Sequence, residues 1–586
     1  MNYEQLVQFV IGDTGESLGK FVPELILCGS ILLMLLLRLF DFTRRLLPSW
    51  FIALVGVTAA FVYSAPWIFL ADGGQISRSE IFTGMLVYDT FTVYFRALLT
   101  FATALFIILT RLTGLANREN DSDFYTLVLG ATVGMCLMAS ANHFLIVFLS
   151  IEMASIPSYA LVGILKGNRK SSEASMKYAV YGAGAAGIML YGISLLAGIS
   201  GSAHLPTIAW RLSQGIGADY QLVLVLAALM LLVGMAFKLS AVPFHFWCPD
   251  AFEGASAEVN GFLSVVSKAA ALALLVRLAV GFSLPPAAEP VMGANEMVMA
   301  AGDQRENPAA AGLMIAKQQN APIFAAAWAE DSRQGHDSPS VAEVVPVADA
   351  PADAGATPTR TFLAYVIAIM AAVTCTFGNL AAYGQTNIKR LLAYSTIAHA
   401  GYMMMPIAAG LLMLENNPLG ATEAFAALLL YAFLYVFMNL GAFAIVAFVR
   451  NAIGSEEIVD YAGLVRSSPG LVFCFAAILF SLIGLPPLAG FLAKLVIFSG
   501  LVNAGMFWLL FIAGANTVIS LFYYLNVLRV MIFDPEPETR EPVHFPMISL
   551  RGIYVAVLTA PMVLLIIQWN GLYEWAIAAC KNLAGA

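Results

Sequence analysis

The sequence predicts an all-α protein that crosses a membrane many times. Of its 586 residues, 60% are hydrophobic and only 11% are charged, whereas soluble domains carry about 25% charged residues. Apolar windows long enough to span a bilayer, about 20 residues each, recur along the chain. They do not show the short alternating apolar and polar segments that are typical of a membrane β-barrel. We therefore expect about fourteen transmembrane helices.

The apolar windows divide the chain into five segments. We expect three spans in residues 1–120, five spans each in residues 121–282 and 361–535, and a loop with the last span in residues 536–586. The N-terminus lacks the basic stretch of a cleavable signal, so we expect it to remain in the mature chain. The predicted spans are residues 22–42, 49–71, 88–113, 123–140, 143–165, 176–200, 219–246, 258–282, 361–383, 388–413, 421–449, 470–500, 505–532 and 552–575.

Positive charge predicts the orientation of these spans. The loops that follow odd-numbered spans carry 16 Lys and Arg residues, whereas the opposite side, which includes both termini, carries 8. Loops rich in Lys and Arg stay on the cytoplasmic side of a membrane. We therefore expect both termini to face outward, in a multi-pass protein.

Residues 283–360 do not follow the membrane pattern. They contain ten acidic and four basic residues, and they are rich in Ala and Pro. This composition is typical of a disordered segment. We expect an acidic insertion on the outer side of the membrane.

Ionisable residues within the spans are the candidates for function. Lys238 and Lys268 lie in consecutive apolar spans. A lysine at the bilayer centre costs roughly 2.5–3.5 kcal/mol on insertion scales, and such residues usually face a bundle interior or water. Glu152 lies in the middle of an earlier span. It could have a function in ion transfer, or it could form a structural ion pair with a neighbouring helix. Both roles are compatible if Glu152 pairs with Lys238. A neighbouring carboxylate favours the charged lysine, so making and breaking this pair would move a proton on and off Lys238.

The polar groups recur at an offset of five spans. Glu152 is in the fifth window and His399 is in the tenth, while Lys238 is in the seventh and Lys494 is in the twelfth. A five-helix unit that is repeated with inverted topology would produce this offset, because an odd number of spans reverses the second copy. Transporters often place their sites at such repeat interfaces, in interrupted helices.

Helix-breaking residues accompany two of the lysines. Pro243 follows Lys238, while Pro486 and Pro487 precede Lys494. Proline interrupts the helical hydrogen bonds, and an interrupted helix is tolerated at membrane depth only inside protein or along a water-filled cavity. We expect both helices to be broken within the membrane.

For three more polar residues, a structural role is at least as well supported as a role in proton transfer. His399 suits a proton relay by its unperturbed pKa, but a buried histidine also satisfies helix contacts. Arg277 lies near the outer end of its span, where a long side chain could snorkel to the surface, so function and anchoring are equally open. His245 lies beside Trp247, and we favour an interfacial, structural role over one in proton uptake.

Cofactor-binding patterns are absent from the sequence. The six cysteines are scattered, without a CxxC pair or a Cys–His cluster, which argues against a disulfide framework or an iron–sulfur site. The Gly-rich run at 182–187 lies inside an apolar span, where it fits close helix packing rather than a phosphate loop. We expect no metal, no redox cofactor and no nucleic-acid partner for this chain.

Four segments resemble the antiporter-like membrane subunits of respiratory complex I, and within that family the resemblance is greatest to the subunit N type. They are LSIEMASIPSYAL, GMAFKLSAVPFHFWCPDAFEGA with the following SKAA, NIKRLLAYSTIAHAGY and GLPPLAGFLAKL. The resemblance covers nearly all fourteen predicted spans. Lysine at position 494 resembles subunits N and L rather than subunit M. The insertion at 283–360 lies outside the family pattern.

The resemblance implies a part in an enzyme, NADH–quinone oxidoreductase, as a proton-translocating subunit in the inner membrane of a bacterium. It implies two inverted five-helix repeats and a proton route through Glu152, Lys238, Lys268 and Lys494, with His399 as a link. It also implies that other membrane-arm subunits are partners, and that FMN, iron–sulfur clusters and quinone are held by partner subunits.

Two other functions share these motifs. One is a subunit of a Mrp-type sodium/proton antiporter, which has no redox partner, and the other is a membrane subunit of a membrane-bound hydrogenase. The spacing of the motifs leaves both open.

Overall fold

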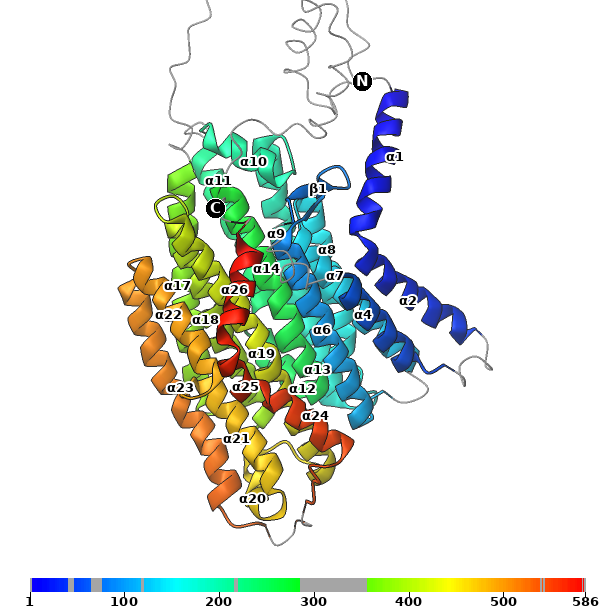
Figure 1. The fold of residues 1–586 in the computed structure, drawn as a ribbon, viewed down its shortest axis with the longest axis vertical. Coiled ribbons are helices and arrows are strands. Elements are labelled where there is room, and N and C mark those ends of the chain that lie inside the picture. Colours follow the sequence, from blue (N-terminus) through cyan, green and yellow to red (C-terminus); the bar gives the residue numbers. More distant parts are fainter. Residues whose placement is uncertain are drawn as a thin grey trace, which may run out of the picture.

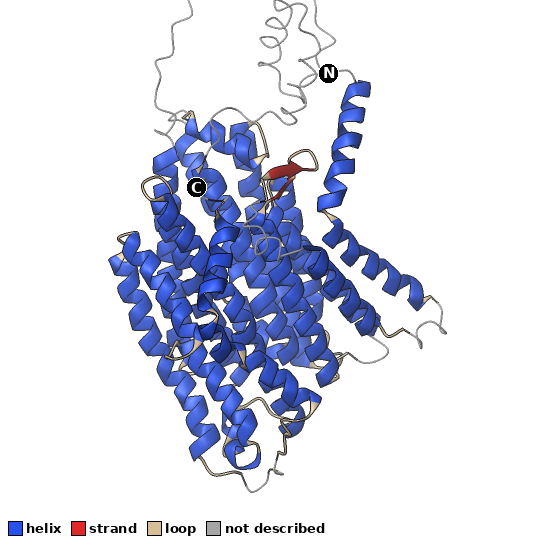
Figure 2. Cartoon of the chain, viewed as in Figure 1, coloured by secondary structure: helices blue, strands red, loops and turns tan. Residues whose placement is uncertain are grey.

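The structure, a computed structural model, describes residues 3–39, 47–64, 76–116, 121–215, 220–284, 356–537, 540, 543–581 and 583. In these ranges the chain is a bundle of long helices (Figure 1), and one short hairpin is its only sheet (Figure 2). Eleven of the described helices are long and apolar enough to cross a membrane, or twelve if one bent pair is one span. The prediction of an all-α membrane protein is confirmed, apart from the hairpin, but the count of fourteen spans is not.

The N-terminal part contains four helices, of which α6 is mostly buried and packs against α7, α13 and α19 of the main bundle. Two of them, α1 and α2, form the bent pair, and the chain turns by 82° between them. Only the second was expected, because the first has a mixed polar sequence. The helices are α1 (Tyr3–Lys20), α2 (Val22–Arg38), α4 (Ser49–Ser64) and α6 (Thr90–Thr113).

The segment that follows contains the first predicted set of five spans. A short amphipathic helix that was not expected, α10 (Leu205–Ser213), connects two of its spans. The other elements are α7 (Asp121–Ser140), α8 (Phe144–Val162), α9 (Arg169–Ser200), α11 (Gln221–Leu239), α12 (Trp247–Gly254), α13 (Ala257–Phe262), the π-helical turn η2 (Leu263–Ser267) and α14 (Lys268–Ser283).

The second set follows after the predicted insertion, whose residues 285–355 lie outside the described ranges. Its elements are α17 (Ala356–Ala382), α18 (Ile388–Met413), α19 (Pro418–Ile453), η3 (Ile458–Tyr461), α20 (Leu464–Ser467), α21 (Pro469–Ile483), α22 (Ala489–Asn503) and α23 (Phe507–Phe533). The chain ends with α24 (Leu550–Thr559), α25 (Pro561–Ile567) and α26 (Trp569–Cys580).

Three of the predicted windows form shorter helices than expected. The window at 49–71 forms α4, which has 16 residues. The window at 470–500 is divided between α21 and α22, and the last window is divided among three helices, with Pro561 at the first division. Because length is one criterion for a span, α4, α21 and α22 are too short to be counted, and α2 is counted only together with α1. The first two helices of the last window are counted together, as Leu550–Ile567.

A central group of helices forms the core of the bundle. The helix from α13 to α14 is completely buried over its apolar window, and α18 and α19 are almost completely buried. Around them, α9, α17 and α23 expose large apolar side chains such as Tyr191, Ile369 and Phe511. Lipid tails are as apolar as these side chains, so the peripheral helices suit a lipid boundary. The core helices carry two of the five predicted proton-path residues, Lys268 and His399.

Candidate functional site

Lys238 lies at the end of α11, directly before a break in the helix. The helix stops at Leu239, Ser240 adopts a left-handed conformation, and the chain becomes helical again at Trp247. The indole nitrogen of Trp247 donates to the carbonyl oxygen of Phe237 at 2.9 Å, which ties the two halves together. The predicted interruption beside Pro243 is confirmed. The helix end beside Lys238 is capped, because the backbone N–H groups of Ser240 and Ala241 donate to the carbonyl oxygens of Phe237 and Ala236.

Lys238 and Glu152 are neighbours but do not form an ion pair. The Lys238 side chain is 1% exposed, and its Nζ donates to Oγ of Ser155 on α8 at 3.0 Å. Glu152 lies one turn before Ser155 on the same helix and is half-buried. Its charge interacts with that of Lys238, yet the described residues include no carboxylate within 4 Å of the lysine. In this structure the hydrogen-bond partner of Lys238 is therefore a neutral hydroxyl group.

Lys268 begins α14, where the π-helical turn η2 ends. Its Nζ donates to the carbonyl oxygen of Thr396 on α18 at 3.1 Å, and the side chain is 1% exposed. A π-helical turn inside an α-helix is rare and is found frequently at functional sites. The contact joins the first predicted five-helix set to the second.

His399 lies on α18, one turn after Thr396, and it is fully enclosed by hydroxyl groups. Its Nδ1 is 2.7 Å from the hydroxyl of Tyr431 on α19, and its Nε2 is 3.3 Å from the hydroxyl of Tyr524 on α23. The Tyr524 hydroxyl also forms a short hydrogen bond with Ser395 Oγ. Both ring nitrogens are therefore in hydrogen-bond contact with groups that can donate and accept a proton.

Lys494 follows the second helix break. The first half, α21, ends at Ile483, and α22 begins at Ala489. Nζ of Lys494 donates to the free carbonyl oxygen of Ile483 at 2.8 Å and lies 4.4 Å from the centre of the Tyr402 ring. The predicted interruption at Pro486 and Pro487 is confirmed, and its broken end supplies the lysine with its acceptor.

One helix, α18, thus carries a row of polar groups between two buried lysines. Thr396 accepts from Lys268, His399 is one turn further along, and Tyr402 contacts Lys494. These positions are three residues apart, so they share one side of the helix. His399 was predicted as a link, but the tyrosines were not, because they come from three different helices, α18, α19 and α23.

Arg277 is an anchor rather than a part of this row. Its guanidinium forms a two-pronged ion pair with the buried Asp89, at 2.6 and 2.5 Å. It also donates to Thr92 Oγ1 at 2.7 Å and to the carbonyl oxygen of Ala139 at 2.9 Å. The side chain does not snorkel, because it is 8% exposed and its partners lie inside the bundle. Of the two alternatives, structural anchoring fits.

His245 is also separated from the lysines. Its ring packs against Phe246 and Phe377, with ring centres 4.3 and 4.4 Å apart. No hydrogen bond joins it to any lysine among the described residues. The aromatic packing agrees with the structural role that we favoured.

A network of ion pairs lies at one end of the bundle, where α12 meets α18. Arg390 contacts Asp250 at 3.1 Å and Glu253 at 2.7 Å. Lys389 is buried and pairs with Glu456 at 2.7 Å. The acidic turn after Lys238 is thus tied to the second set of helices.

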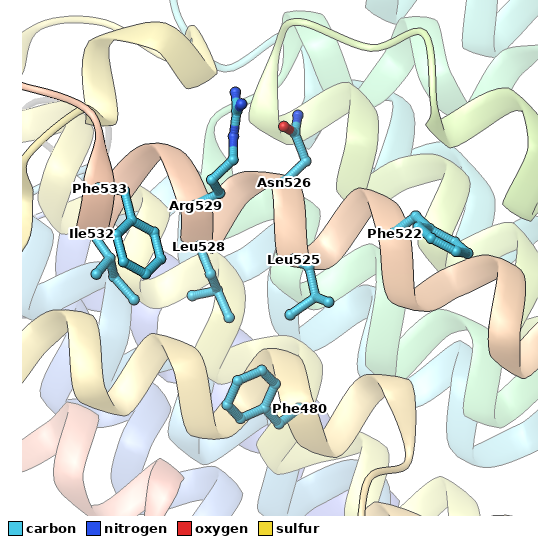
Figure 3. Close-up of a pocket in the computed structure, with 8 residues that line it drawn as sticks. All are labelled: Phe480, Phe522, Leu525, Asn526, Leu528, Arg529, Ile532 and Phe533. Carbon is cyan, nitrogen blue, oxygen red and sulfur yellow. The ribbon is translucent and has the colours of Figure 1, made fainter.

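A groove of about 510 Å³ lies elsewhere, between α21 and α23. In Figure 3, Leu525, Leu528 and Ile532 point toward Phe480, while Asn526 and Arg529 point away from it. None of the candidate site residues lines this groove. Nor do the described residues contain a group of three His, Cys, Asp or Glu side chains that could hold a metal ion. The polar row on α18 is therefore the candidate functional site.

The chain matches a known family over more than half of its length. The family is described as "NADH:quinone oxidoreductase/Mrp antiporter, TM", and the match covers residues 141–299 and 356–520. The chain belongs to this family. The matched residues include Glu152 and all three buried lysines of the site, so the family match and the site coincide.

Family members with a curated name or a solved structure cover nearly the whole chain. NADH-quinone oxidoreductase subunit N of Anaeromyxobacter sp. is 35% identical over 86% of this chain and 86% of its own. A chain of respiratory complex I from Thermus thermophilus is 26% identical, with a TM-score of 0.65 over 95% of this chain and all of its own. A chain of the Mrp complex from Dietzia sp. has a TM-score of 0.72 over 97% of this chain and 98% of its own at 16% identity, which shows a shared fold only.

Proposed function

We propose that this chain is the proton-translocating subunit N of a bacterial NADH–quinone oxidoreductase. The observation that carries the proposal is the polar row on α18, which includes His399 and lies between Lys268 and Lys494 inside a membrane bundle. Ionisable residues within a membrane usually mark an ion pathway. The name of the 35% identical relative and the complex I chain from Thermus thermophilus support the assignment.

The proposed mechanism has two parts. Lys238 exchanges its Ser155 partner for Glu152 when the electrostatics of the neighbouring subunits change, and the ion pair holds the proton on Lys238. When the pair opens, the positive charge on Lys238 repels the proton on Lys268. That proton then moves through His399 toward Lys494, from which it leaves.

The proposed architecture specifies the number, orientation and repeat structure of the membrane spans. All fourteen apolar windows cross the membrane, and residues 121–282 and 361–535 are inverted five-helix repeats. Both termini and the insertion at 283–360 face outward, and residues 1–120 and 536–586 flank the repeats. Other membrane-arm subunits bind this chain. FMN, iron–sulfur clusters and quinone bind to partner subunits.

The replacement of Lys238 by Ala tests the proposed function. We expect the Lys238→Ala variant to assemble normally and to lose NADH-driven proton pumping, because no other group on α11 can hold that proton. The measurement is acidification of vesicles that contain the purified complex, with bound flavin as the measure of assembly. Arg529→Ala is the matched control, since this basic side chain is 63% exposed and its ion-pair partner, Asp534, is outside the row. Pumping at the wild-type rate in Lys238→Ala would refute the mechanism.

A Mrp-type sodium/proton antiporter remains the second candidate, because the description of the matching family names Mrp antiporters beside NADH:quinone oxidoreductase. Purification of the tagged chain separates the two functions. Flavin and NADH–quinone reductase activity that co-purify support the first, whereas a flavin-free complex whose transport depends on sodium supports the second.

A further inference from the structure

A second buried acid, Glu258, lies on the first turn of α13, outside the polar row. Its side chain is 0% exposed. One carboxylate oxygen, Oε1, is 3.4 Å from Nη2 of Arg450 on α19, and the other oxygen has no hydrogen-bond partner among the described residues. A buried carboxylate is costly unless it is paired and hydrogen bonded. The long, single contact leaves Glu258 poorly satisfied for a purely structural ion pair.

Arg450 connects this buried acid to the end of the bundle. Its side chain is 21% exposed, and it also donates to Asn451 Oδ1 at 2.7 Å. Lys389 on α18 is the other cation whose charge interacts with Glu258, and Lys389 is itself paired with Glu456. Glu258 is thus at the inner limit of a charged patch that reaches the surface.

Unpartnered polar atoms lie between Glu258 and Lys268. Both side-chain polar atoms of Asn439 on α19 lack a hydrogen bond, as do Oγ of Ser267, Oδ1 of Asn260 and the hydroxyl of Tyr435. Asn439 is 0% exposed and Tyr435 is 2% exposed. In folded proteins most buried polar atoms are bonded to protein or to ordered water, and a buried water typically makes about three such bonds.

Helix α19 packs against α13 and η2, which form the helical stretch from Glu258 to Lys268. A Cβ built on Gly261 would lie 3.0 Å from Leu440, which is next to Asn439. Tyr435 is one turn from Asn439, and its hydroxyl lies near Thr396, which accepts from Lys268. Glu258 and Lys268 are ten residues apart, or roughly 15 Å along the helix. Asn260 and Ser267 lie within this stretch.

We propose that Glu258 collects protons from the end of the bundle and passes them to Lys268 through water bound at Asn439, Ser267 and Tyr435. This inference rests on the proposed function. A proton from bulk water binds the Glu258 carboxylate, moves along the bound water and converts a neutral Lys268 amine into the ammonium form. Glu258 returns to its anion beside Arg450. Asn439 is a positioning residue for the water and does not itself carry the proton.

The test compares isosteric variants of the assembled complex in vesicles. Glu258→Gln should lower the initial pumping rate at pH 8 about tenfold and at pH 6 much less, because bulk protons must then load Lys268 directly. Glu253→Gln is the matched control, since this acid lies in the same region but is paired with Arg390 at the rim. Glu258→Asp should recover part of the rate. A structural defect would instead lower the rate equally at every pH, and that outcome would overturn the proposal.

Asn439 gives an independent test. Asn439→Leu keeps the volume but cannot bind water, and we expect it to reproduce the pH-dependent loss of Glu258→Gln. Asn439→Ser, which keeps a hydroxyl and leaves space for water, should restore most of the rate. The Lys268→Ala variant distinguishes a failure of the proposed function from a failure of the proposed water path. Normal pumping in Lys268→Ala would contradict the proposed function. If Lys268→Ala stops pumping but Glu258→Gln and Asn439→Leu pump like the wild type, only the proposed water path from Glu258 to Lys268 is contradicted.

Discussion

At the residue scale, the site includes a close contact between Gly484 and Lys494. Gly484 has φ = +85°, which favours glycine. A Cβ at this position would also lie 2.9 Å from Cδ of Lys494. The missing side chain therefore lets the lysine reach the carbonyl oxygen of Ile483. The position of Lys494 depends on a neighbour that has no side chain.

We expect Gly484→Ala to reduce pumping by displacing Lys494. The left-handed backbone alone costs an alanine roughly 1–2 kcal/mol, and the lysine must move as well. Thermal unfolding of the purified complex and vesicle acidification measure the two effects. Gly514→Ala is the control, because a Cβ at Gly514 meets no atom within 4 Å. Equal pumping in the two variants would mean that the Gly484 contact does not position Lys494.

The sequence predicted the ionisable residues but not their partners. Lys238, Lys268 and Lys494 were found because a charge in an apolar window is conspicuous. The acceptors are a serine hydroxyl and two backbone carbonyls, and such groups are present in every helix. Asp89 was missed as the partner of Arg277 because the two are 188 residues apart. Pairing depends on tertiary packing, which a single sequence does not contain.

At the element scale, the unexpected hairpin connects three loops at one end of the bundle. Its strands are β1 (Ser79–Ile81) and β2 (Leu86–Tyr88), which pair antiparallel with Ser79 opposite Tyr88. Asn142 donates to Glu80 Oε1 at 3.1 Å, and His204 Nε2 is 3.5 Å from Glu80 Oε2. Three-residue strands are too short to give a periodic pattern, so the sequence did not indicate them.

The hairpin should loosen in acid. Burial raises the pKa of the Glu80 carboxyl, but the hydrogen bonds and charge of His204, with Asn142 and Arg78, outweigh it and lower the pKa below its ordinary value near 4.5. A lowered pKa in the folded state adds stability above pH 4.5, and that stability is lost as the pH falls through the folded pKa. Faster amide hydrogen exchange in residues 79–88 at pH 3.5 than at pH 6, after correction for intrinsic rates, is the expected result. A Glu80→Gln variant should not show this change.

The broken helices show which element features a sequence can predict. Proline and glycine predicted both interruptions because their effect on a helix is local. The π-helical turn before Lys268 has no comparable signal in its residues, LSVVS. It lies where α13, α14 and α19 pack together, so it reflects the neighbouring helices as well as its own sequence.

At the scale of the whole molecule, the membrane class followed from composition, whereas the number of spans did not. Interrupted helices fall below the length of a span even when the apolar window is continuous. The orientation in the membrane depends on how the Lys and Arg residues are distributed among all the loops, so it is a property of the whole chain.

Both termini should lie on the outer side of the membrane, because the basic residues are concentrated on the other side. Epitope tags with a protease site at either terminus should be cleaved in intact spheroplasts and protected in inverted vesicles. A tag inserted next to Lys166, in a basic loop, should show the opposite behaviour. The same protection for the terminal tags and the Lys166 tag would contradict the predicted orientation.

The three buried lysines have a further consequence for the energised membrane. Among the described residues, none of them has a carboxylate within 4 Å, whereas Arg277 is neutralised by Asp89. Each proton that binds Lys268 or Lys494 therefore adds a charge that no adjacent carboxylate balances, inside the electric field of the membrane. Moving one charge through the full field requires about 2.3 kcal/mol per 100 mV, and a lysine part of the way across experiences part of it. The protonation of this chain should thus depend on voltage, even at constant pH.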